Sequence, residues 1–494
     1  VSSDTRYASK GRFTQSVNID VNTGKFGSYT SYRRQQAEGW QLNPYEENSK
    51  THELEETGKV ASTGFYANTV NQKFTFDATD KLSFYARGGY YDNKTRRPYE
   101  AYDYNILHET FNYGIGAQYM INKGNYITAD CYADHFSSSY CFFKDNKTYN
   151  GKAGEEQVRK RTRNHNLSIK GIFKLGNRHK LSVGTEYIVD VLKSQTDNIA
   201  KEDAYTLALF AQDEIKLLRN LQALIGVRYI YHENFKNHAT PNVALMYKPG
   251  KFNFRASYAA GFRTPTLSEL YATDIAKKND RLTIGNLDLK PEKNNYFSLS
   301  AEYVHERFSV SVNAFYNNIR DMIDYNTIAT GDKAMEQYGH KEVRQRDNIA
   351  EAKVHGINVS ANAYLGAGFN LSGGYTHLNT QDVELEQPID KSIKNAYNIN
   401  AQWAHSWKIY RLNINLNGRF NSKRFSKSYG YAPEYQLWDL NTRHSFNLKS
   451  VIIEPGCGME NLFDYMDDRP YNSNYATLTP GRSFYISLSL KFKS

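Results

Sequence analysis

The sequence has few of the residues that mark soluble multidomain proteins. Its 494 residues include only 11 prolines, and no Pro- or Ser-rich stretch separates one part of the chain from another. No run of about 18 apolar residues occurs and the mean hydropathy is -0.70, so membrane-spanning helices are excluded. A membrane β-barrel is not excluded, because its strands show lipid only at every second residue. The lack of linkers predicts one continuous architecture.

Cysteine is also scarce, and Cys131, Cys141 and Cys457 lack the spacing of a metal or redox site. Two interpretations of Cys131 and Cys141 stay open: a disulfide across one strand-to-loop junction in an oxidising compartment, or two unpaired buried thiols. Residues 1–10 are polar and contain no signal peptide. We therefore expect the mature start or an upstream segment to lie outside this sequence.

The sequence also lacks catalytic motifs: it has no serine elbow, no metal-binding histidine pair and no phosphate-binding glycine loop. These absences predict that the protein is not an enzyme. The net charge is +10, and cations gather at residues 158–163 and 423–427. No nucleic-acid recognition motif accompanies them, so we expect no nucleic-acid partner and interpret both runs as solvated loops that face anionic lipid headgroups or ligand.

Aromatic residues are abundant, with 40 Tyr, 26 Phe and 4 Trp, which together make 14% of the chain. Tyrosine suits the boundary between lipid and water, because its ring is apolar and its hydroxyl needs a polar partner. Composition alone leaves a tyrosine-rich soluble β protein equally open.

Strict alternation of apolar and polar residues is the main structural signal. Residues 308–314 and 410–417 alternate in this way, and the clearest example is near the C-terminus, with Phe484, Ile486, Leu488, Leu490 and Phe492 on one face and Tyr485, Ser487, Ser489 and Lys491 on the other. We predict about 21 such strands of about 9–14 residues, close to the length that spans a membrane.

The connections between these strands alternate in length. Short turns, as at residues 22–24 and 122–124, are followed by long loops, as at residues 137–162 and 262–293. This is typical of bacterial outer-membrane barrels, which have short periplasmic turns and long extracellular loops. A β-propeller would repeat about every 40–45 residues, and no such repeat is visible.

The predicted fold class is an all-β, transmembrane antiparallel barrel. Outer-membrane lipase or protease barrels, the alternative with enzymatic function, have only about 10–12 strands.

The order of the turns predicts a direction. The first predicted strand, residues 12–21, enters a short turn and so descends toward the periplasm. Single-chain bacterial barrels have an even number of strands with both ends periplasmic. One strand is therefore expected before Val1, for a total of about 22, the number found in plugged transporters. We expect a plug domain upstream as well, which makes residues 1–494 the barrel.

Two motifs resemble those of the TonB-dependent outer-membrane receptor family. The first spans residues 261–271 and 285–292 and contains Phe262, Arg263, Pro265, Glu269, Leu270, Tyr271, Asn286, Leu289, Pro291 and Glu292. The second spans residues 460–464 and 479–484 and leads into the terminal strand. The terminal aromatic face, with Phe484 and Phe492, resembles the family's barrel-insertion signal.

The resemblance implies energy-coupled import of a scarce large ligand across the bacterial outer membrane. It implies a small-molecule ligand, outer-membrane lipid and the TonB complex of the inner membrane as partners, the last reached through the plug. A ligand-capturing lipoprotein at the cell surface is a further candidate partner. A passive porin or adhesin barrel is the alternative from another class, although an unplugged barrel of this width would leak.

Residues 320–325 and 352–359 resemble the cobalamin transporter branch, so cobalamin or a related corrinoid is the expected ligand. A haem or iron-siderophore receptor is the alternative. Residues 264–285 lack the histidine that haem receptors carry in this loop.

Asp145, Glu155 and Glu156 lack the dense carboxylate spacing of a calcium site. We therefore predict no metal site and no cofactor.

Prolines cannot donate to a strand ladder, so Pro265 and Pro291 predict the edges of one large surface loop. For Arg263, Glu269 and Glu292 a loop-anchoring cluster is favoured over direct ligand contact. Flat side chains that could cover a large ligand occur in the predicted loops: Trp40, Tyr45, Tyr99, Tyr102, Tyr104, Tyr140 and Phe142. These residues and Arg263 are the candidate ligand contacts, and girdle or packing roles stay open for each ring.

Overall fold

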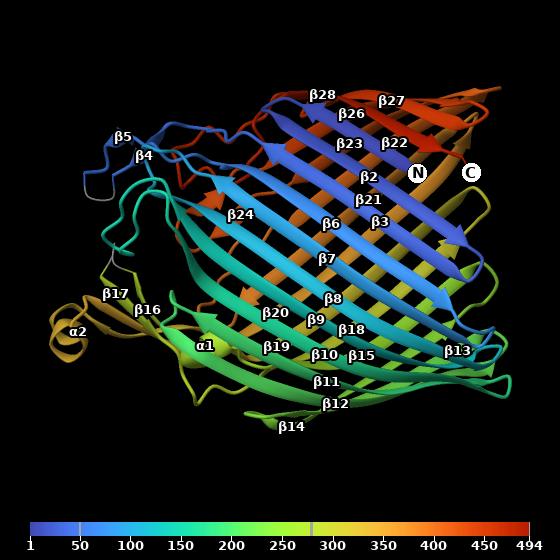
Figure 1. The fold of residues 1–494 in the computed structure, drawn as a ribbon, viewed down its shortest axis with the longest axis horizontal. Helices are drawn as coiled ribbons and strands as arrows, with labels where there is room; N and C mark the ends of the chain where they lie inside the picture. Colours follow the sequence, from blue (N-terminus) through green and yellow to red (C-terminus); the bar gives the residue numbers. More distant parts are fainter. Residues whose placement is uncertain (49–50, 277–279, 494) are drawn as a thin grey trace.

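The chain forms one closed antiparallel β-barrel of 22 strands in a computed structural model that describes residues 1–48, 51–276 and 280–493 (Figure 1). The barrel strands are β1 (Ser2–Ala8), β2 (Arg12–Thr23), β3 (Phe26–Ala37), β6 (Gly64–Asp77), β7 (Leu82–Arg96), β8 (Tyr104–Asn122), β9 (Asn125–Phe142), β10 (Glu156–Leu175), β11 (His179–Ser194), β12 (Ile199–Leu218), β13 (Leu221–His232), β14 (Lys236–Tyr247), β15 (Phe252–Arg263), β18 (Glu292–Val304), β19 (Phe308–Thr330), β20 (Glu342–Gly366), β21 (Phe369–Asp382), β22 (Asn395–Trp407), β23 (Tyr410–Asn421), β26 (Tyr435–Asn447), β27 (Val451–Glu460) and β28 (Ser483–Phe492). The predicted fold class is confirmed.

The shorter elements lie in the loops. They are β4 (Tyr45–Glu47), β5 (Leu54–Glu56), α1 (Leu267–Tyr271), β16 (Thr273–Ala276), β17 (Arg281–Ile284), α2 (Gly331–Tyr338), β24 (Arg424–Ser426) and β25 (Gly430–Ala432). Neither of the two helices in the described chain is long and apolar enough to cross a membrane.

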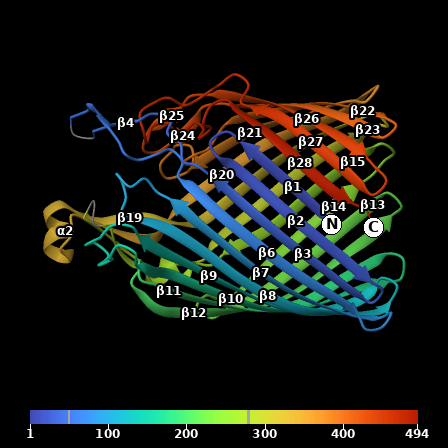
Figure 2. The same ribbon diagram turned by 45° about the horizontal axis from the view of Figure 1, so that its top comes forward.

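The barrel closes between the first and last strands of the chain. β1 pairs with β28 from Ser2↔Lys491 to Ala8↔Tyr485, and its other edge pairs with β2 (Figure 2). The total of 22 strands is confirmed, but the first strand lies inside the chain and not before Val1 as predicted. β1 was missed because it is only seven residues long and mostly polar. Both chain ends lie at the end of the barrel that carries the short turns (Figure 1), as even-numbered barrels require.

Strand pairing sorts the side chains into two faces. Between β20 and β26, one row of paired positions is polar and the next row is largely apolar. The polar row is Asn362, Ser372, Asn400, Asn417 and Asp439, and the next row is Ala361, Gly373, Ile399, Gly418 and Trp438. In a membrane barrel the apolar rows face lipid and the polar rows line the lumen. The alternation of polar and apolar residues in the sequence therefore corresponds to the inner and outer faces of the barrel wall.

Several strands are longer than the predicted 9–14 residues. β10 and β12 have 20 residues each, β19 has 23 and β20 has 25. At about 3.3 Å per residue, β20 extends over roughly 80 Å. The loop predicted at residues 137–162 is accordingly reduced to residues 143–155. Pairing continues beyond the membrane because neighbouring strands still satisfy each other's backbone groups there.

The longest hairpin, β19–α2–β20, projects from the barrel at the end with the long loops (Figure 1). β17 joins it by parallel pairing with β20, from Arg281↔Glu342 to Ile284↔Gln345. Ala329, Ala334 and Val343 form a small buried cluster in this projection, with Leu282 packed against it. The hairpin thus has an apolar core of its own outside the barrel wall.

The proposed disulfide between Cys131 and Cys141 is wrong. Both residues belong to β9, ten positions apart, which separates their Cα atoms by about 33 Å. A disulfide needs Cα atoms about 5.5–6 Å apart. All three cysteines are free, and Cys131 and Cys457 are exposed on the wall, so the alternative of two buried thiols does not hold for Cys131 either.

We predict that the denatured protein reacts with three equivalents of a maleimide per chain before reduction, because no pair of thiols can meet. Mass spectrometry with and without a reductant checks the count. A chain that takes up one equivalent before reduction and three after it would contradict this arrangement of β9.

Candidate functional site

The first family motif forms an ion-pair cluster at the base of the largest loop. Arg263 ends β15 and lies opposite Glu292, the first residue of β18. Its Nε donates to Glu292 Oε2 at 2.8 Å, and its Nη1 donates to Glu269 Oε2 at 2.9 Å. Both carboxylate side chains are only 14% exposed. The predicted ion-pair cluster of these three residues is present, whereas its anchoring role and ligand contact by Arg263 stay predictions.

A capping box holds Glu269 in this position. Thr266 caps α1, its hydroxyl accepts from the Glu269 backbone N–H, and its own N–H donates to Glu269 Oε2 at 2.8 Å. Burial opposes the charge of Glu269, but the hydrogen bonds from Arg263 and Thr266 outweigh it and hold the pKa of this carboxyl below its usual range. One glutamate therefore caps the helix and pairs with the loop's arginine.

The other residues of the motif pack around the cluster. Pro265 and Pro291 are buried and lie outside the strands, as predicted. Phe262 stacks on His238 with ring centroids 4.7 Å apart. Leu270 and Leu289 are each 4% exposed and pack with Ile323 and Tyr271, while Asn286 donates from Nδ2 to the Arg346 carbonyl at 3.0 Å. The motif is the structural base of the loop.

The segment that resembled the cobalamin branch also has a structural role. The β19–β20 register shifts between Ile319 and Met322, and Asp321 has a positive φ of 55°. Asn348 Nδ2 donates to the Asp321 carbonyl, and the Ile323 N–H donates to Glu292 Oε1 at 2.9 Å. This bulge connects the projecting hairpin to the Arg263 cluster.

We predict that Glu269→Gln exposes the loop at residues 264–291 to hydrogen exchange. Because the folded pKa of Glu269 is depressed, its contribution to stability is fully present above its unfolded pKa of about 4.3 and is lost as pH falls through the lower folded pKa. The variant should lose about 1–2 kcal/mol of local opening free energy at neutral pH.

Hydrogen-exchange mass spectrometry between pH 3 and 7, corrected for intrinsic rates, measures this. Glu306→Gln, in a short turn at the opposite end of the barrel, is the matched control and should retain wild-type protection. Equal protection of the loop in Glu269→Gln and in the wild type would refute the anchoring role.

Five of the predicted ligand contacts come together near the mouth, in a cluster of aromatic and arginine side chains. Tyr104 and Tyr140 are stacked, with centroids 4.1 Å apart, and Tyr149 lies 5.2 Å from Tyr140. Tyr102 lies beside them, and Tyr99 is 60% exposed and stacks on Phe143. Phe142 is 3% exposed, packs against Gly151 and lies beside Tyr104, with ring centroids 5.6 Å apart. Strand register places Tyr104 and Tyr140 on the lumen face.

Two guanidinium groups cover these rings. The Arg97 guanidinium lies 3.7 Å from the Tyr102 ring centre and 4.9 Å from that of Tyr104. The Arg159 guanidinium lies 4.9 Å from the Tyr149 ring centre. Neither arginine has a carboxylate within 4.0 Å among the described residues. Arg97 Nη1 and Arg159 Nε are buried donors without a hydrogen-bond partner there. We name Tyr102, Tyr104, Tyr140, Tyr149, Arg97 and Arg159 the mouth cluster.

The arginines and Tyr149 were not identified from the sequence. A shift in the β9–β10 register between Val158 and Lys160 redirects Arg159 toward Tyr140 and Tyr149. A bulge of this kind interrupts the alternation, and nothing in the sequence pattern fixes its position. Residues 158–163 were expected to be a loop, but they belong to β10.

Trp40 and Tyr45 contact the last long loop of the barrel. Trp40 donates from Nε1 to the Leu478 carbonyl at 2.9 Å, and the Tyr45 carbonyl accepts from the Tyr471 N–H at 2.7 Å. Both contacts join the first long loop to the last one across the seam of the barrel. Their part in ligand contact stays a prediction.

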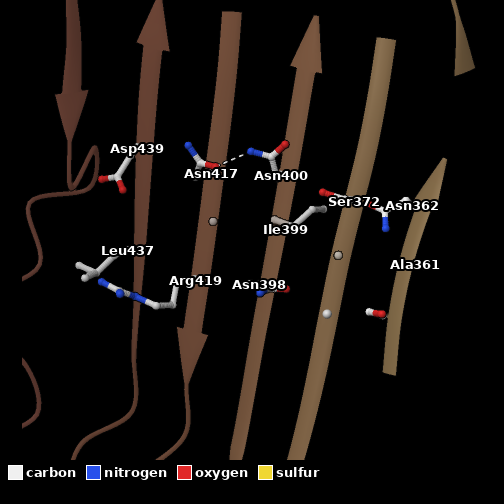
Figure 3. A pocket seen from close by; sticks show the side chains of 14 residues that line it. Ala361, Asn362, Ser372, Asn398, Ile399, Asn400, Asn417, Arg419, Leu437 and Asp439 are labelled. Carbon is white, nitrogen blue, oxygen red and sulfur yellow. Dashed lines mark hydrogen bonds between the residues drawn. The ribbon is translucent and has the colours of Figure 1, made fainter. Parts of the chain in front are cut away.

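The lumen wall below the mouth is rich in amides (Figure 3). A hollow of about 460 Å³ is bordered by Asn362, Asn398, Asn400, Asn417 and Arg419 among others. Asn400 donates from Nδ2 to the side-chain oxygens of Asn417 and Asn415. Such a wall offers donors and acceptors with little net charge. It can hydrogen-bond a polar surface inside the barrel without a strong electrostatic preference.

Comparison with known proteins identifies the class. Residues 4–461 match the family model described as TonB dependent receptor-like, beta-barrel, and the chain belongs to this family. The family places the barrel in the outer membrane, and its members are receptors and transporters, not enzymes. The match ends before β28, so the insertion role of Phe484 and Phe492 stays a prediction.

Among solved structures, the chain is similar to a mutant of the ferric enterobactin receptor PfeA from Pseudomonas aeruginosa, with a TM-score of 0.82 and 16% identity over 99% of this chain and 80% of that one. It is also similar to the siderophore receptor PirA from Acinetobacter baumannii, with a TM-score of 0.76 and 14% identity over 99% and 80% of the two chains. The FrpB iron transporter from Neisseria meningitidis has a TM-score of 0.75 and 13% identity over the same shares. At such identities the likeness establishes the fold alone.

No group of three or more His, Cys, Asp or Glu side chains that could hold a metal ion occurs among the residues that the structure describes. The mouth cluster consists of arginine and tyrosine side chains, which offer cationic and aromatic surface to an incoming molecule.

Proposed function

We propose that this barrel imports a negatively charged ferric siderophore across the bacterial outer membrane, with energy supplied through TonB. The observation that carries the proposal is the mouth cluster: two guanidinium groups without a carboxylate partner, held over tyrosine rings that face the lumen. Similar structures are receptors for siderophores or iron transporters, which supports this reading over cobalamin.

The chemistry of the cluster favours an anionic ligand with flat faces. An arginine that stacks on a tyrosine keeps its charge and its in-plane donors, because the ring engages only the face of the guanidinium. The charged guanidinium groups of Arg97 and Arg159 can then attract carboxylate or phenolate oxygens of the ligand. The rings of Tyr104 and Tyr140 supply apolar surface for its flat parts.

Cobalamin, the ligand first expected, has less support. Of the residues that suggested it, 320–325 form the bulge at Asp321 and the start of the outer hairpin, and 352–359 belong to β20 in the barrel wall. No similar structure reported above is a cobalamin transporter. The haem alternative also lacks a histidine in residues 264–285.

In the proposed mechanism, the mouth cluster retains the ligand and a plug inside the barrel moves when TonB pulls on it. The plug is expected upstream of Val1 and would pack against the amide-rich lumen wall. Capture of ligand by a surface lipoprotein remains a separate prediction. A passive porin or adhesin would need neither the plug nor energy from the inner membrane.

We predict that Arg97→Gln combined with Arg159→Gln weakens binding of an anionic ferric catecholate by about 10- to 100-fold, as expected for the loss of two charge-assisted contacts. Fluorescence quenching of the purified full-length receptor measures the affinity. Lys333→Gln removes an exposed cation in α2 and is the matched control, which should bind as the wild type does.

A ferric hydroxamate of zero net charge, cobalamin and haem complete the ligand panel. Tight binding of cobalamin with no binding of any ferric siderophore would overturn the proposal. Uptake into cells should also stop when the inner-membrane proton gradient is collapsed, and uptake that continues would favour the passive barrel.

A further inference from the structure

The cations of residues 158–163 are divided between the two faces of the wall. Arg159 stacks on the tyrosines of the mouth cluster, and Lys160 Nζ lies 3.6 Å from Asp197 Oδ2. Below the bulge, Arg161 pairs with Ser137 and Arg163 pairs with His135. Both of these arginines are exposed. Each is an even number of residues from Leu167, which faces the lipid, so all three side chains lie on the same face of β10. They therefore point away from the lumen.

One face of β10 changes from apolar to cationic toward the cell exterior. Its exposed residues are, in order along the strand, Arg161, Arg163, His165, Leu167 and Ile169. Leu167 is 50% exposed and Ile169 is 45% exposed, as expected for side chains in hydrocarbon. At about 6.6 Å per pair of residues, Arg163 lies about 13 Å along the strand from Leu167. The arginines are thus at the upper edge of the apolar band, where lipid headgroups begin.

Neighbouring strands extend this charge into a patch. Lys193 of β11 is exposed and lies opposite Arg161. The His135 and His165 rings are 5.4 Å apart, and Tyr113 lies 5.8 Å from His135. We name Arg161, Arg163, Lys193, His135 and His165 the outer-wall basic patch.

The cations of this patch lack protein counter-ions. In the described part of the chain, no carboxylate lies within 4.0 Å of Arg161, Arg163 or Lys193. Of the carboxylates on the same face, Glu109 accepts from the Tyr90 hydroxyl at 2.7 Å, and Asp203 pairs with Lys201 at 2.9 Å. Glu156 lies farther out, opposite Cys141. Three cations next to an apolar wall are thereby left for an anion from outside the protein.

We infer that the outer-wall basic patch binds the phosphate groups of a phosphorylated glycolipid in the outer leaflet, whose acyl chains lie against Leu167 and Ile169. The guanidinium groups of Arg161 and Arg163 match phosphate in bidentate geometry. A soluble anion would satisfy the charge alone, whereas the continuous apolar face below it fits an anion that carries hydrocarbon chains. The inference rests on the outer-membrane location of the family and is independent of the imported ligand.

Native mass spectrometry of receptor refolded without lipid, in detergent, tests this with two probes: diphosphorylated lipid A and the same lipid without phosphates. We expect the wild type to bind the phosphorylated probe about tenfold more tightly than the dephosphorylated one. Arg161→Gln combined with Arg163→Gln should remove this preference. Lys170→Gln, a cation on the lumen face of the same strand, is the matched control and should keep it.

Retention of the native barrel by each variant is checked by its heat-dependent mobility in gels. A double variant that folds and still prefers the phosphorylated probe would overturn the inference, as would an equal loss in Lys170→Gln. Inorganic phosphate that binds as tightly as the phosphorylated lipid would also overturn it, because the acyl chains would then contribute nothing.

Discussion

The structure depends on one constraint: no backbone N–H or C=O in the hydrocarbon region can be left without a partner. A sheet meets this requirement only by closing, and closure here rests on seven residues. Ser2–Ala8 pairs on one side with β2 and on the other with β28, and the Phe492 N–H donates to the Val1 carbonyl at 2.9 Å. The wall has an inside and an outside only because the sheet closes at this seam. Closure therefore decides which side chains contact lipid and which face the lumen.

Within the closed wall, side-chain alternation separates two kinds of chemistry. The lumen face is rich in amides and carries the mouth cluster above them, whereas the outer face carries apolar residues with cations at its upper edge. The bulge beside Arg159 determines which cations of β10 point toward the lumen and which point toward the membrane. The proposed sites of ligand capture and lipid binding are therefore adjacent in the sequence although they are on opposite sides of the wall.

The sequence predicted the barrel, the number of strands and the base of the large loop. Alternation is a local property, so strands such as 483–492 can be read directly, and prolines 265 and 291 mark loop edges because they cannot join a ladder. The seven residues of β1 carry too little apolar pattern to be recognised. The contact between Arg97 and Tyr102 depends on strand register and on bulges, which the alternation of residue types does not determine. The separation of Cys131 from Cys141 depends on where β9 ends, which the sequence pattern also left open.

The outer hairpin has a consequence for variation among related receptors. Ala334 of its tip, α2, packs with Ala329 and Val343 in a core of the hairpin's own. Exposed residues there, such as Met335, can change without cost to the seam or to the Arg263 cluster. The hairpin can therefore vary in sequence and length while the strand pairing at the seam and the ion pairs of Arg263 stay the same.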